Sequence, residues 1–440
     1  MAPDYDNDYR FAWRWILPGS PSISVTGDAK ANAFLQTCIP TQPSEPKVVV
    51  IDADIWANNT PALSSAELRN VDCFALFGSW HAVTRLTRTL GQSEADARDY
   101  GLLPPRSPRV VIPLSSRLSA IRGLSLHNPG SRPARWALWM LRGLASLGIL
   151  APLRQKMLRL ISHEPLRPWA LNGLDTRLDA RDDFALYLGA KGPNRKTVAL
   201  PTGGSGHPGQ IIKTAEQLLA KEKLANEARM LHRLAETSVA PHIPAAVSFH
   251  EGTSVSVLVQ EYRLVTPCRA EDKRIAASRF LDSIYRARQK QEPLDTLIQR
   301  LGRPLAVRTT AREQVLDALC QKAKGLTAPI GITHGDFAPW NCGLSSGQLV
   351  VYDWEEGKVD GIPLDDAFSY AVFPLLLISH ILDPRKLTFE AVAFAKSIYA
   401  GSDMDTRTIQ ACFALWCLRR SADFFPDLFT LMAREVTNDL

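Results

Sequence analysis

The sequence predicts an α+β protein in which a strand-rich segment precedes a helical one, with a small α/β domain in front of both. Three observations support this. Strand-like runs separated by turn-forming residues follow one another between residues 184 and 260. Apolar residues at three- and four-residue spacing then indicate helices, for example over residues 312–325. Shorter apolar runs bounded by chain-breaking residues occur nearer the N-terminus, at residues 13–18, 47–55 and 109–114.

The composition is that of a folded protein. The 440 residues are 45% hydrophobic and 22% charged, and the net charge of +6 is mild for this length. Such a charge fits an anionic ligand and does not indicate a nucleic-acid partner. The seven cysteines are scattered and lack zinc-site spacing, so we expect reduced thiols and a cytoplasmic location. We find no secretory signal and no apolar run long enough to span a membrane.

One stretch, residues 332–355, carries polar residues at informative intervals. Asn341 follows Asp336 by five residues, and Asp353 ends an apolar run. Between them, residues 345–347 (Ser-Ser-Gly) favour a hairpin turn, which would bring Asn341 roughly opposite Tyr352 and Asp353. An amide oxygen and a carboxylate converging on one point would suit a hard cation. Asp336 would stand close by, ready to take a proton from a hydroxyl.

The motifs H-G-D-F-A-P-W-N and V-V-Y-D-W-E in this stretch resemble the catalytic and metal loops of the aminoglycoside phosphotransferase and choline kinase group. The resemblance covers about residues 180–440. It implies a two-lobed protein-kinase-like fold that uses ATP and Mg²⁺. It also implies that Asp336 is the catalytic base, that His334 braces the catalytic loop, and that Asn341 and Asp353 bind the metal.

A lysine and a glutamate predict the nucleotide site. Lys213 lies within the third strand-like run, residues 210–215. Glu227 lies three residues after Leu224 and four before Leu231, on the apolar face of a predicted helix. A buried carboxylate needs a partner, and Lys213 is the candidate. In kinase-like folds such a pair lets the lysine hold the nucleotide phosphates.

Further nucleotide contacts follow from the order of the kinase-like strands. The turn between the first two strands contains Gly192 and Asn194, which we predict to cover the phosphates. After the last strand, Gln260, Glu261 and Tyr262 occupy the hinge position, where backbone groups bind the base in this family.

The segment G-I-P-L-D-D-A resembles another family motif, and its matching acid is Asp366. The resemblance gives Asp366 a structural role, accepting hydrogen bonds from the backbone of the catalytic loop. A helix N-cap is the alternative, and Asp365 could fill that role equally well.

The first 130 residues are harder to interpret. Asp52 and Asp54 end an apolar strand and are either ligands or solvated strand ends. We favour solvated ends, because no glycine-rich phosphate loop follows a strand there. Residues 100–114 faintly resemble the last strands of methyltransferase-like domains, whose cofactor loop is missing, so we predict an inert or regulatory domain.

A basic, tryptophan-containing segment follows. Trp136 and Trp139 alternate with Arg135 and Arg142 in a helix-like run. Residues 135–160 could contact the inner face of an anionic membrane, or the helix could pack between two domains with its arginines in solvent.

Together these observations predict four segments and one activity. The segments are a small α/β domain, a basic amphipathic helical linker, a kinase-like small lobe and a helical large lobe, at residues 1–130, 131–170, 171–262 and 263–440. The predicted activity is that of a small-molecule kinase, transferring the γ-phosphate of ATP to a hydroxyl of a sugar, aminoglycoside or amino-alcohol. The alternative is a retired kinase-like nucleotide-binding scaffold, although every chemical position carries the expected residue.

Overall fold

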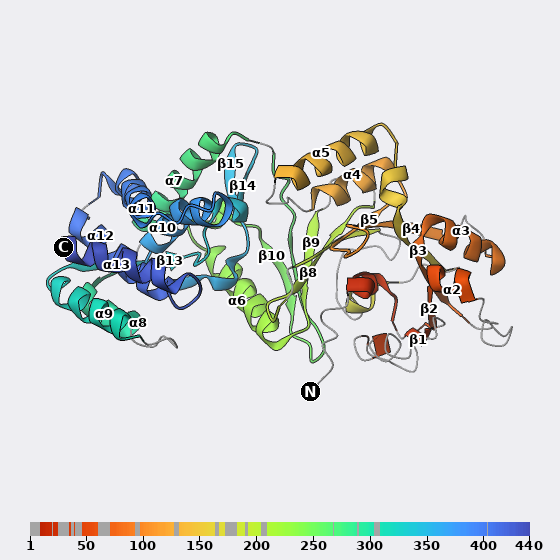
Figure 1. Cartoon of the computed structure of the whole chain (residues 1–440), viewed down its shortest axis with the longest axis horizontal. Coiled ribbons are helices and arrows are strands. Elements are labelled where there is room, and N and C mark those ends of the chain that lie inside the picture. Colours follow the sequence, from red (N-terminus) through yellow and green to blue (C-terminus); the bar gives the residue numbers. More distant parts are fainter. Residues whose placement is uncertain are drawn as a thin grey trace. The chain divides into compact units, whose positions relative to one another are not determined.

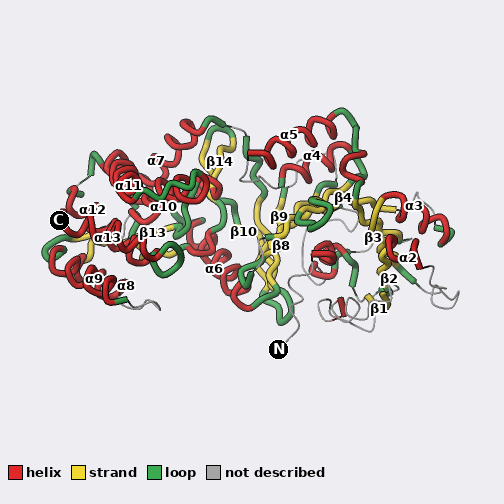
Figure 2. The backbone as a smooth tube through the Cα atoms, viewed as in Figure 1, coloured by secondary structure: helices red, strands yellow, loops and turns green. Residues whose placement is uncertain are grey.

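The computed structural model describes residues 9–19, 21–24, 35–36, 39, 46–59, 71–92, 97–126, 132–162, 167–171, 183–189, 192–203, 209–266, 268–287, 290–302, 309–402 and 404–440. The chain divides into two compact units. The sheet unit comprises residues 1–225 and 247–262, and the helical unit comprises residues 226–246 and 263–440. Strands dominate the first unit and helices the second (Figure 2), which confirms the predicted α+β class.

The sheet unit is built on one sheet of 11 strands, in the order β1-β2-β3-β6-β4-β5-β7-β8-β9-β11-β10. Strands β1 to β3 pair in parallel, and the pairs from β3–β6 to β9–β11 are antiparallel. The strands are β1 (Pro21–Ser24), β2 (Val48–Asp52), β3 (Cys73–Ser79), β4 (Ala97–Leu103), β5 (Val110–Pro113), β6 (Lys156–Ile161), β7 (Phe184–Leu188), β8 (Lys196–Pro201), β9 (Gln210–Ala215), β10 (Ala246–His250) and β11 (Ser256–Glu261).

Helices and short helical turns connect these strands. They are η2 (Tyr9–Ile16), α2 (Ala53–Asn59), α3 (Trp80–Thr89), α4 (Arg117–Ser125), α5 (Arg132–Ser146), η4 (Ala151–Arg154) and η5 (Trp169–Leu171). Helix α6 (Leu218–Leu234) begins in this unit and continues into the helical unit from residue 226. Helix α4 packs on β5 and β7, and α5 packs on α4 (Figure 1). The five strands predicted between residues 184 and 260 are all present.

The predicted helical linker is only partly helical. Helix α5 covers its first half, but Lys156–Ile161 forms strand β6, which pairs with both β3 and β4. The side chains from Met157 to Ile161 are buried, including Arg159, whose guanidinium donates to the Asp99 carboxylate at 2.7 and 2.9 Å. The arginines and lysine of residues 154–159 suggested a solvated helix, whereas ion pairing allows Arg159 to lie inside the sheet.

The run at residues 13–18, predicted as a strand, is instead a 3₁₀ helix over Tyr9–Ile16. Trp13, Trp15 and Leu17 are all buried. A short run whose side chains are all buried does not distinguish a strand from a helical turn, because the periodicity of burial is lost. The indole N–H of Trp169 donates to the Arg14 carbonyl oxygen, which ties this turn to η5.

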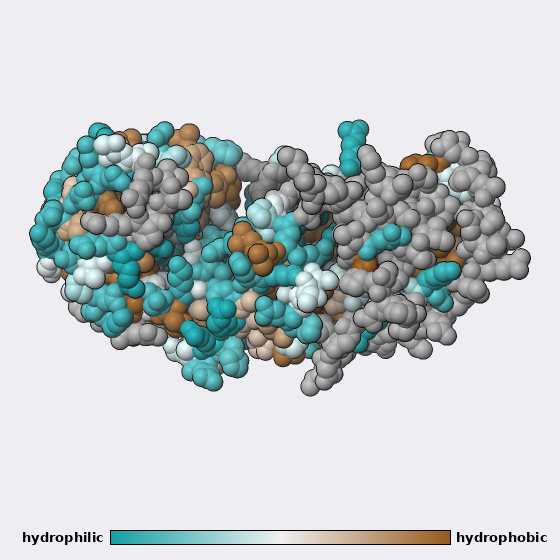
Figure 3. Space-filling model, turned by 90° about the horizontal axis from the view of Figure 1, so that it is seen from below, coloured by the Kyte–Doolittle hydropathy of each residue, from teal (hydrophilic) through white to brown (hydrophobic). Residues whose placement is uncertain are grey.

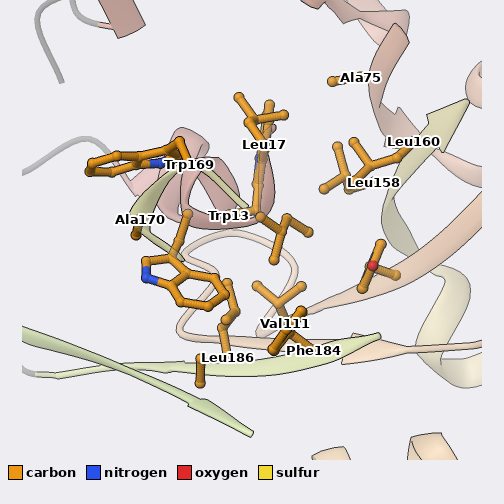
Figure 4. Close-up of a cluster of buried hydrophobic side chains, with 14 of the residues drawn as sticks. Trp13, Leu17, Ala75, Val111, Leu158, Leu160, Trp169, Ala170, Phe184 and Leu186 are labelled. Carbon is orange, nitrogen blue, oxygen red and sulfur yellow. The ribbon is translucent and has the colours of Figure 1, made fainter. Parts of the chain in front are cut away.

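One hydrophobic core joins the N-terminal strands to the strands from β7 onward. Trp13 and Leu158 pack in the same cluster as Phe184 and Leu186 (Figure 4). Phe77 of β3 belongs to this cluster as well. The cluster extends to Ile212 of β9 and to Val257 and Val259 of β11. Because one sheet and one core run through both parts, we infer that they fold as one body.

Asp52 and Asp54 have local structural roles. The Asp52 carboxylate accepts hydrogen bonds from the backbone N–H groups of Asp54 and Ile55, which starts α2. The Asp54 carboxylate accepts from the backbone N–H and the hydroxyl of Ser79 at the end of β3. Asp52 therefore caps α2, and Asp54 connects the first turn of α2 to the end of β3.

The helical unit contains two small sheets among its helices. Strands β12 (Lys290–Pro293), β13 (Thr327–Thr333) and β16 (Lys358–Gly361) form one sheet, and β14 (Cys342–Ser345) and β15 (Gln348–Val351) form the other. The helical segments are η6 (Ala240–His242), α7 (Ala270–Arg286), α8 (Leu294–Gly302), α9 (Thr310–Lys322), η7 (Pro339–Asn341), η8 (Trp354–Glu356), α10 (Leu364–Phe373), η9 (Pro374–Ile378), α11 (Pro384–Tyr399), α12 (Thr406–Arg420) and α13 (Pro426–Asp439). Among the described residues, none of the helices is both long and apolar enough to span a bilayer.

Candidate active site

The predicted hairpin is present in the helical unit. Strands β14 and β15 pair in antiparallel register, with Cys342 opposite Val351. One step beyond the register, the Tyr352 N–H donates to the Asn341 carbonyl oxygen at 2.8 Å. Strand β13 leads directly into the loop that carries His334 and Asp336. The loop and the hairpin thus bring together the polar residues that lie between Thr333 and Asp353.

Asn341 holds the Asp336 side chain. Its side-chain amide donates to one Asp336 carboxylate oxygen at 3.0 Å and to the Asp336 backbone carbonyl oxygen at 2.8 Å. Both amide hydrogens face Asp336, so the Asn341 side-chain oxygen remains as an acceptor or metal ligand. The Asp336 carboxylate keeps a second oxygen for a hydroxyl proton.

His334 is a buried brace. Its ring Nε2 lies 2.6 Å from the Tyr352 carbonyl oxygen, which can only accept, so Nε2 carries the proton. Nδ1 then accepts from the Asp336 N–H at 3.3 Å. The imidazole is fully buried and packs against the Trp354 ring, with the centroids 4.8 Å apart. It links the catalytic loop to the end of β15.

Asp366 supports the loop through two hydrogen bonds of the kind that the resemblance implies. Its two carboxylate oxygens accept the N–H groups of His334 at 2.6 Å and Gly335 at 2.9 Å. Burial raises the pKa of this fully enclosed carboxyl to about 7, while the two N–H groups oppose the rise. Its neighbour Asp365 pairs instead with Arg419 of α12.

Sequence reasoning missed two cations that brace the loop. Arg420 of α12 donates to the Gly335 carbonyl oxygen at 2.5 Å. Lys273 of α7 donates to the carbonyl oxygens of Pro339 and Cys342 at 3.0 and 3.1 Å. Neither lies within 60 residues of its partner, since the separations are 85, 66 and 69 residues. No local pattern could have identified them.

The pKa of Asp336 is raised to about 6. Burial is the largest cause, and the negative charges of Asp353 and Glu355 add to it. The Arg420 guanidinium and the Asn341 hydrogen bond oppose the rise. A carboxylate tuned in this way is ionised at neutral pH yet more basic than a free aspartate, as a general base needs to be.

Gly335 is the one position in the loop where only glycine fits. Its φ of +83° lies in the left-handed region, and a Cβ there would stand 2.5 Å from the Glu356 carbonyl oxygen. The backbone of the loop therefore passes directly against the η8 turn that follows Asp353.

Asp353 leaves β15 in a left-handed conformation, with φ of 59° and ψ of 56°. Aspartate tolerates this conformation better than most side chains do, and such local strain is common at functional sites. The oxygens of Asp353 and Asn341 fit Mg²⁺, which is usually held by one or two protein oxygens together with phosphates and water. Among the described residues, no cluster of three or more His, Cys, Asp or Glu side chains that could hold a metal occurs.

The residues predicted to bind the nucleotide lie partly in the sheet unit and partly in the helical unit. In the sheet unit, Lys213 is 5% exposed in β9, opposite Leu258 of β11. In the helical unit, Glu227 of α6 is fully buried. Gly192 and Asn194 form the turn between β7 and β8, with φ of +136° at Gly192.

The hinge candidates lie at the end of β11. Gln260 and Glu261 pair with Ile211 and Gln210 of β9. The Tyr262 N–H donates to the Gly209 carbonyl oxygen at 3.1 Å. The side chain of Gln260 is buried.

Solved structures of other proteins are similar to part of this chain. A thermostable mutant of aminoglycoside phosphotransferase APH(4)-Ia is 13% identical, over 58% of this chain and 94% of its own, with a TM-score of 0.41. This chain is similar to small-molecule kinases. Amicoumacin kinase hAmiN, in complex with AMP-PNP, Ca²⁺ and Ami, is 13% identical over 58% and 88% of the two chains, with a TM-score of 0.38.

A third similar structure is ADP-bound aminoglycoside phosphotransferase APH(2'')-Ib, 13% identical over 55% of this chain and 94% of its own, with a TM-score of 0.32. Neither a protein-family model nor a curated protein sequence matches the chain.

Proposed function

We propose that this protein is a small-molecule kinase that transfers the γ-phosphoryl group of ATP to an alcohol, with Mg²⁺ as cofactor. The observation that carries the proposal is the clamp on Asp336. A half-buried carboxylate with a pKa near 6 is held by Asn341 in a loop that Asp366, His334 and Arg420 brace. A surface loop would not need this degree of support.

Asp336 is the proposed base. Its free oxygen accepts a hydrogen bond from the acceptor hydroxyl, orients the hydroxyl oxygen towards the γ-phosphorus and takes the proton as the new P–O bond forms and the bond to ADP breaks. Catalysis of this kind depends mainly on positioning and charge neutralisation, which favours a rigid loop.

Asn341 and Asp353 are the proposed ligands of Mg²⁺. When bound, the metal neutralises the charge of the nucleotide phosphates. Asn341 would use its side-chain oxygen for the metal while its amide group keeps Asp336 in place. The same residue would thus set the position of the base relative to the metal.

Lys213 and Glu227 are proposed to act as a pair, in which the glutamate orients the lysine towards the nucleotide phosphates. Their burial supports this, because a buried charge is stable only beside a partner. We assign the turn at Gly192 and Asn194 to the phosphates, and the backbone of Gln260, Glu261 and Tyr262 to the base.

The acceptor is proposed to be a small hydroxyl compound of the sugar, aminoglycoside or amino-alcohol type. The test measures Mg²⁺-dependent ATP consumption by the full chain against a panel of these acceptors, with Asp336→Asn as the inactive comparison. Turnover with one class that the variant loses would support the proposal. ATP binding without turnover for any class would favour a nucleotide-binding scaffold.

A further inference from the structure

Helix α5 carries an apolar face that faces outward. Trp136, Trp139 and Met140 of the helix are 66, 68 and 55% exposed, and Leu147 and Ile149 just after it are 72 and 47% exposed. The first four lie at spacings of three, one and seven residues, which places them along one side of a helix. These five side chains are called the α5 face below.

The opposite side of α5 already has its packing partner. Leu138, Leu141 and Ala145 pack towards α4 in one cluster. Among the described residues, α4 is the element against which α5 makes its main contacts. Helix α5 is therefore not an ordinary amphipathic helix, because apolar side chains lie both on the side packed against α4 and on the exposed side.

Ordinary surface exposure does not account for the face. Single exposed apolar side chains are normal, and the surface in Figure 3 shows small brown islands separated by teal among the described residues. On α5, by contrast, two tryptophans stand edge to face with their ring centroids 5.7 Å apart. Paired exposed tryptophans on one helix are typical of the boundary between water and lipid.

The segment of the chain that carries the face has charge of one sign. No aspartate or glutamate occurs between Asp99 and Glu164, although this stretch contains ten basic residues, namely Arg106, Arg109, Arg117, Arg122, Arg132, Arg135, Arg142, Arg154, Lys156 and Arg159. Arg135 is exposed next to Trp136. Arg117, also exposed, lies 3.1 Å from the position that a Cβ on Gly148 would take, beside Leu147 and Ile149.

Not every arginine here is available at the surface. Arg142 turns inward and donates from Nε and Nη2 to the Leu124 carbonyl oxygen at the end of α4, at 3.2 and 2.7 Å. Arg142 thus locks α5 onto α4. The outward charge at the rim of the face comes from Arg135 at one end and Arg117 at the other.

We propose that the α5 face binds the surface of an anionic lipid bilayer, with the tryptophans in the headgroup layer and Arg135 and Arg117 against lipid phosphates. The positive charges of Arg135 and Arg117 favour a lipid bilayer over a second copy of this chain. A second copy of the chain, docked by the same face, would bring two basic rims together without an acid between them. Lipid phosphates supply the missing negative charge.

The test is sedimentation of the full chain with vesicles of phosphatidylcholine containing about 30% phosphatidylglycerol, beside vesicles of phosphatidylcholine alone. We expect binding to the anionic vesicles that weakens as salt rises from about 50 to 500 mM. Trp136→Ser with Trp139→Ser should weaken it about tenfold or more. Arg135→Ser and Arg117→Ser should each weaken it about fivefold.

Phe389→Ser is the matched control, because Phe389 is 70% exposed on α11 next to an acid, Glu390. It should leave vesicle binding unchanged, and circular dichroism should show that every variant keeps its fold. Wild-type protein that stays in the supernatant, or tryptophan variants that bind as well as wild type, would overturn the proposal. Concentration-dependent dimers that the tryptophan variant loses would assign the face to a second copy instead.

Discussion

The loop that carries Asp336 and the N-terminal part of the sheet unit differ in how far apart in sequence their contacts lie. In the loop, Asn341 holds Asp336 from five residues away, and His334 meets Tyr352 from 18 residues away. In the sheet unit, Arg14 pairs with Glu216 across 202 residues, and Trp169 donates to Arg14 across 155. Contacts between residues that lie close in sequence can be recognised as a motif. Contacts between distant residues leave no such pattern, and the sequence then shows only separate apolar runs.

The most damaging expected change to the loop is Asp336→Asn. Loss of the base should lower kcat about 10²- to 10⁴-fold. Folding raises the pKa of Asp336 from 3.8 to about 6, so the folded state disfavours its ionised form above pH 6. The variant should therefore be as stable as wild type or more so, by up to about 1–2 kcal/mol at pH 8.

The measurements are ATP turnover with the responsive acceptor and thermal unfolding at pH 8. Asp360→Asn, at an exposed acid on β16, is the comparison and should keep near-normal turnover. Near wild-type turnover in Asp336→Asn would remove Asp336 as the base.

The sheet unit should be most sensitive at Trp13. This side chain is fully buried, with its ring centroid 5.4 Å from that of Phe77. Trp13→Ala should destabilise the protein by about 3–5 kcal/mol. Because the core is shared, amide hydrogen exchange should accelerate in β8 and β9 as well as in β2 and β3.

Trp136→Ala provides the matched control, since the same atoms are removed from a site that is 66% exposed, and stability should change little. Faster exchange confined to the strands before β7 would show that the N-terminal part has a core of its own.

Gly335→Ala tests how tightly the loop is held. The left-handed backbone and the Cβ contact with Glu356 should together cost about 2–3 kcal/mol of stability. Gly347→Ala has nearly the same φ, +81°, but nothing lies within 4 Å of its Cβ, so about 1 kcal/mol is expected. Chemical denaturation of both variants separates the cost of the Cβ contact with Glu356 from the cost of the left-handed backbone. Equal losses of stability in the two variants would argue against a cost from the contact.

The smallest expected effect lies in the pH profile. kcat/KM should rise as Asp336 ionises, with half of the maximum reached near pH 6. Arg420 lowers the pKa of Asp336, so Arg420→Gln should move the midpoint to higher pH. The variant's kcat should therefore fall less at pH 9 than at pH 6. An unshifted midpoint would mean that Arg420 supports the loop without acting on the charge of Asp336.

The sequence predicted the parts whose residues lie close together. The hairpin, the five strands after residue 184 and the Asp366 contacts with the loop are all present. Arg420 and Lys273 escaped prediction because they reach the loop from α12 and α7. Strand β6 was not predicted because Arg159 suggested a solvent-exposed segment. Its partner, Asp99, lies 60 residues away in the sequence.

The position of β6 also bears on the order of folding. The strand lies between β3 and β4 in the sheet, yet it follows both in the chain. A nascent chain made from the N-terminus would hold β3 and β4 with unpaired edges until residues 156–161 leave the ribosome. During that interval the early strands could pair with other chains, so expression should be sensitive to chaperone supply and to the rate of synthesis.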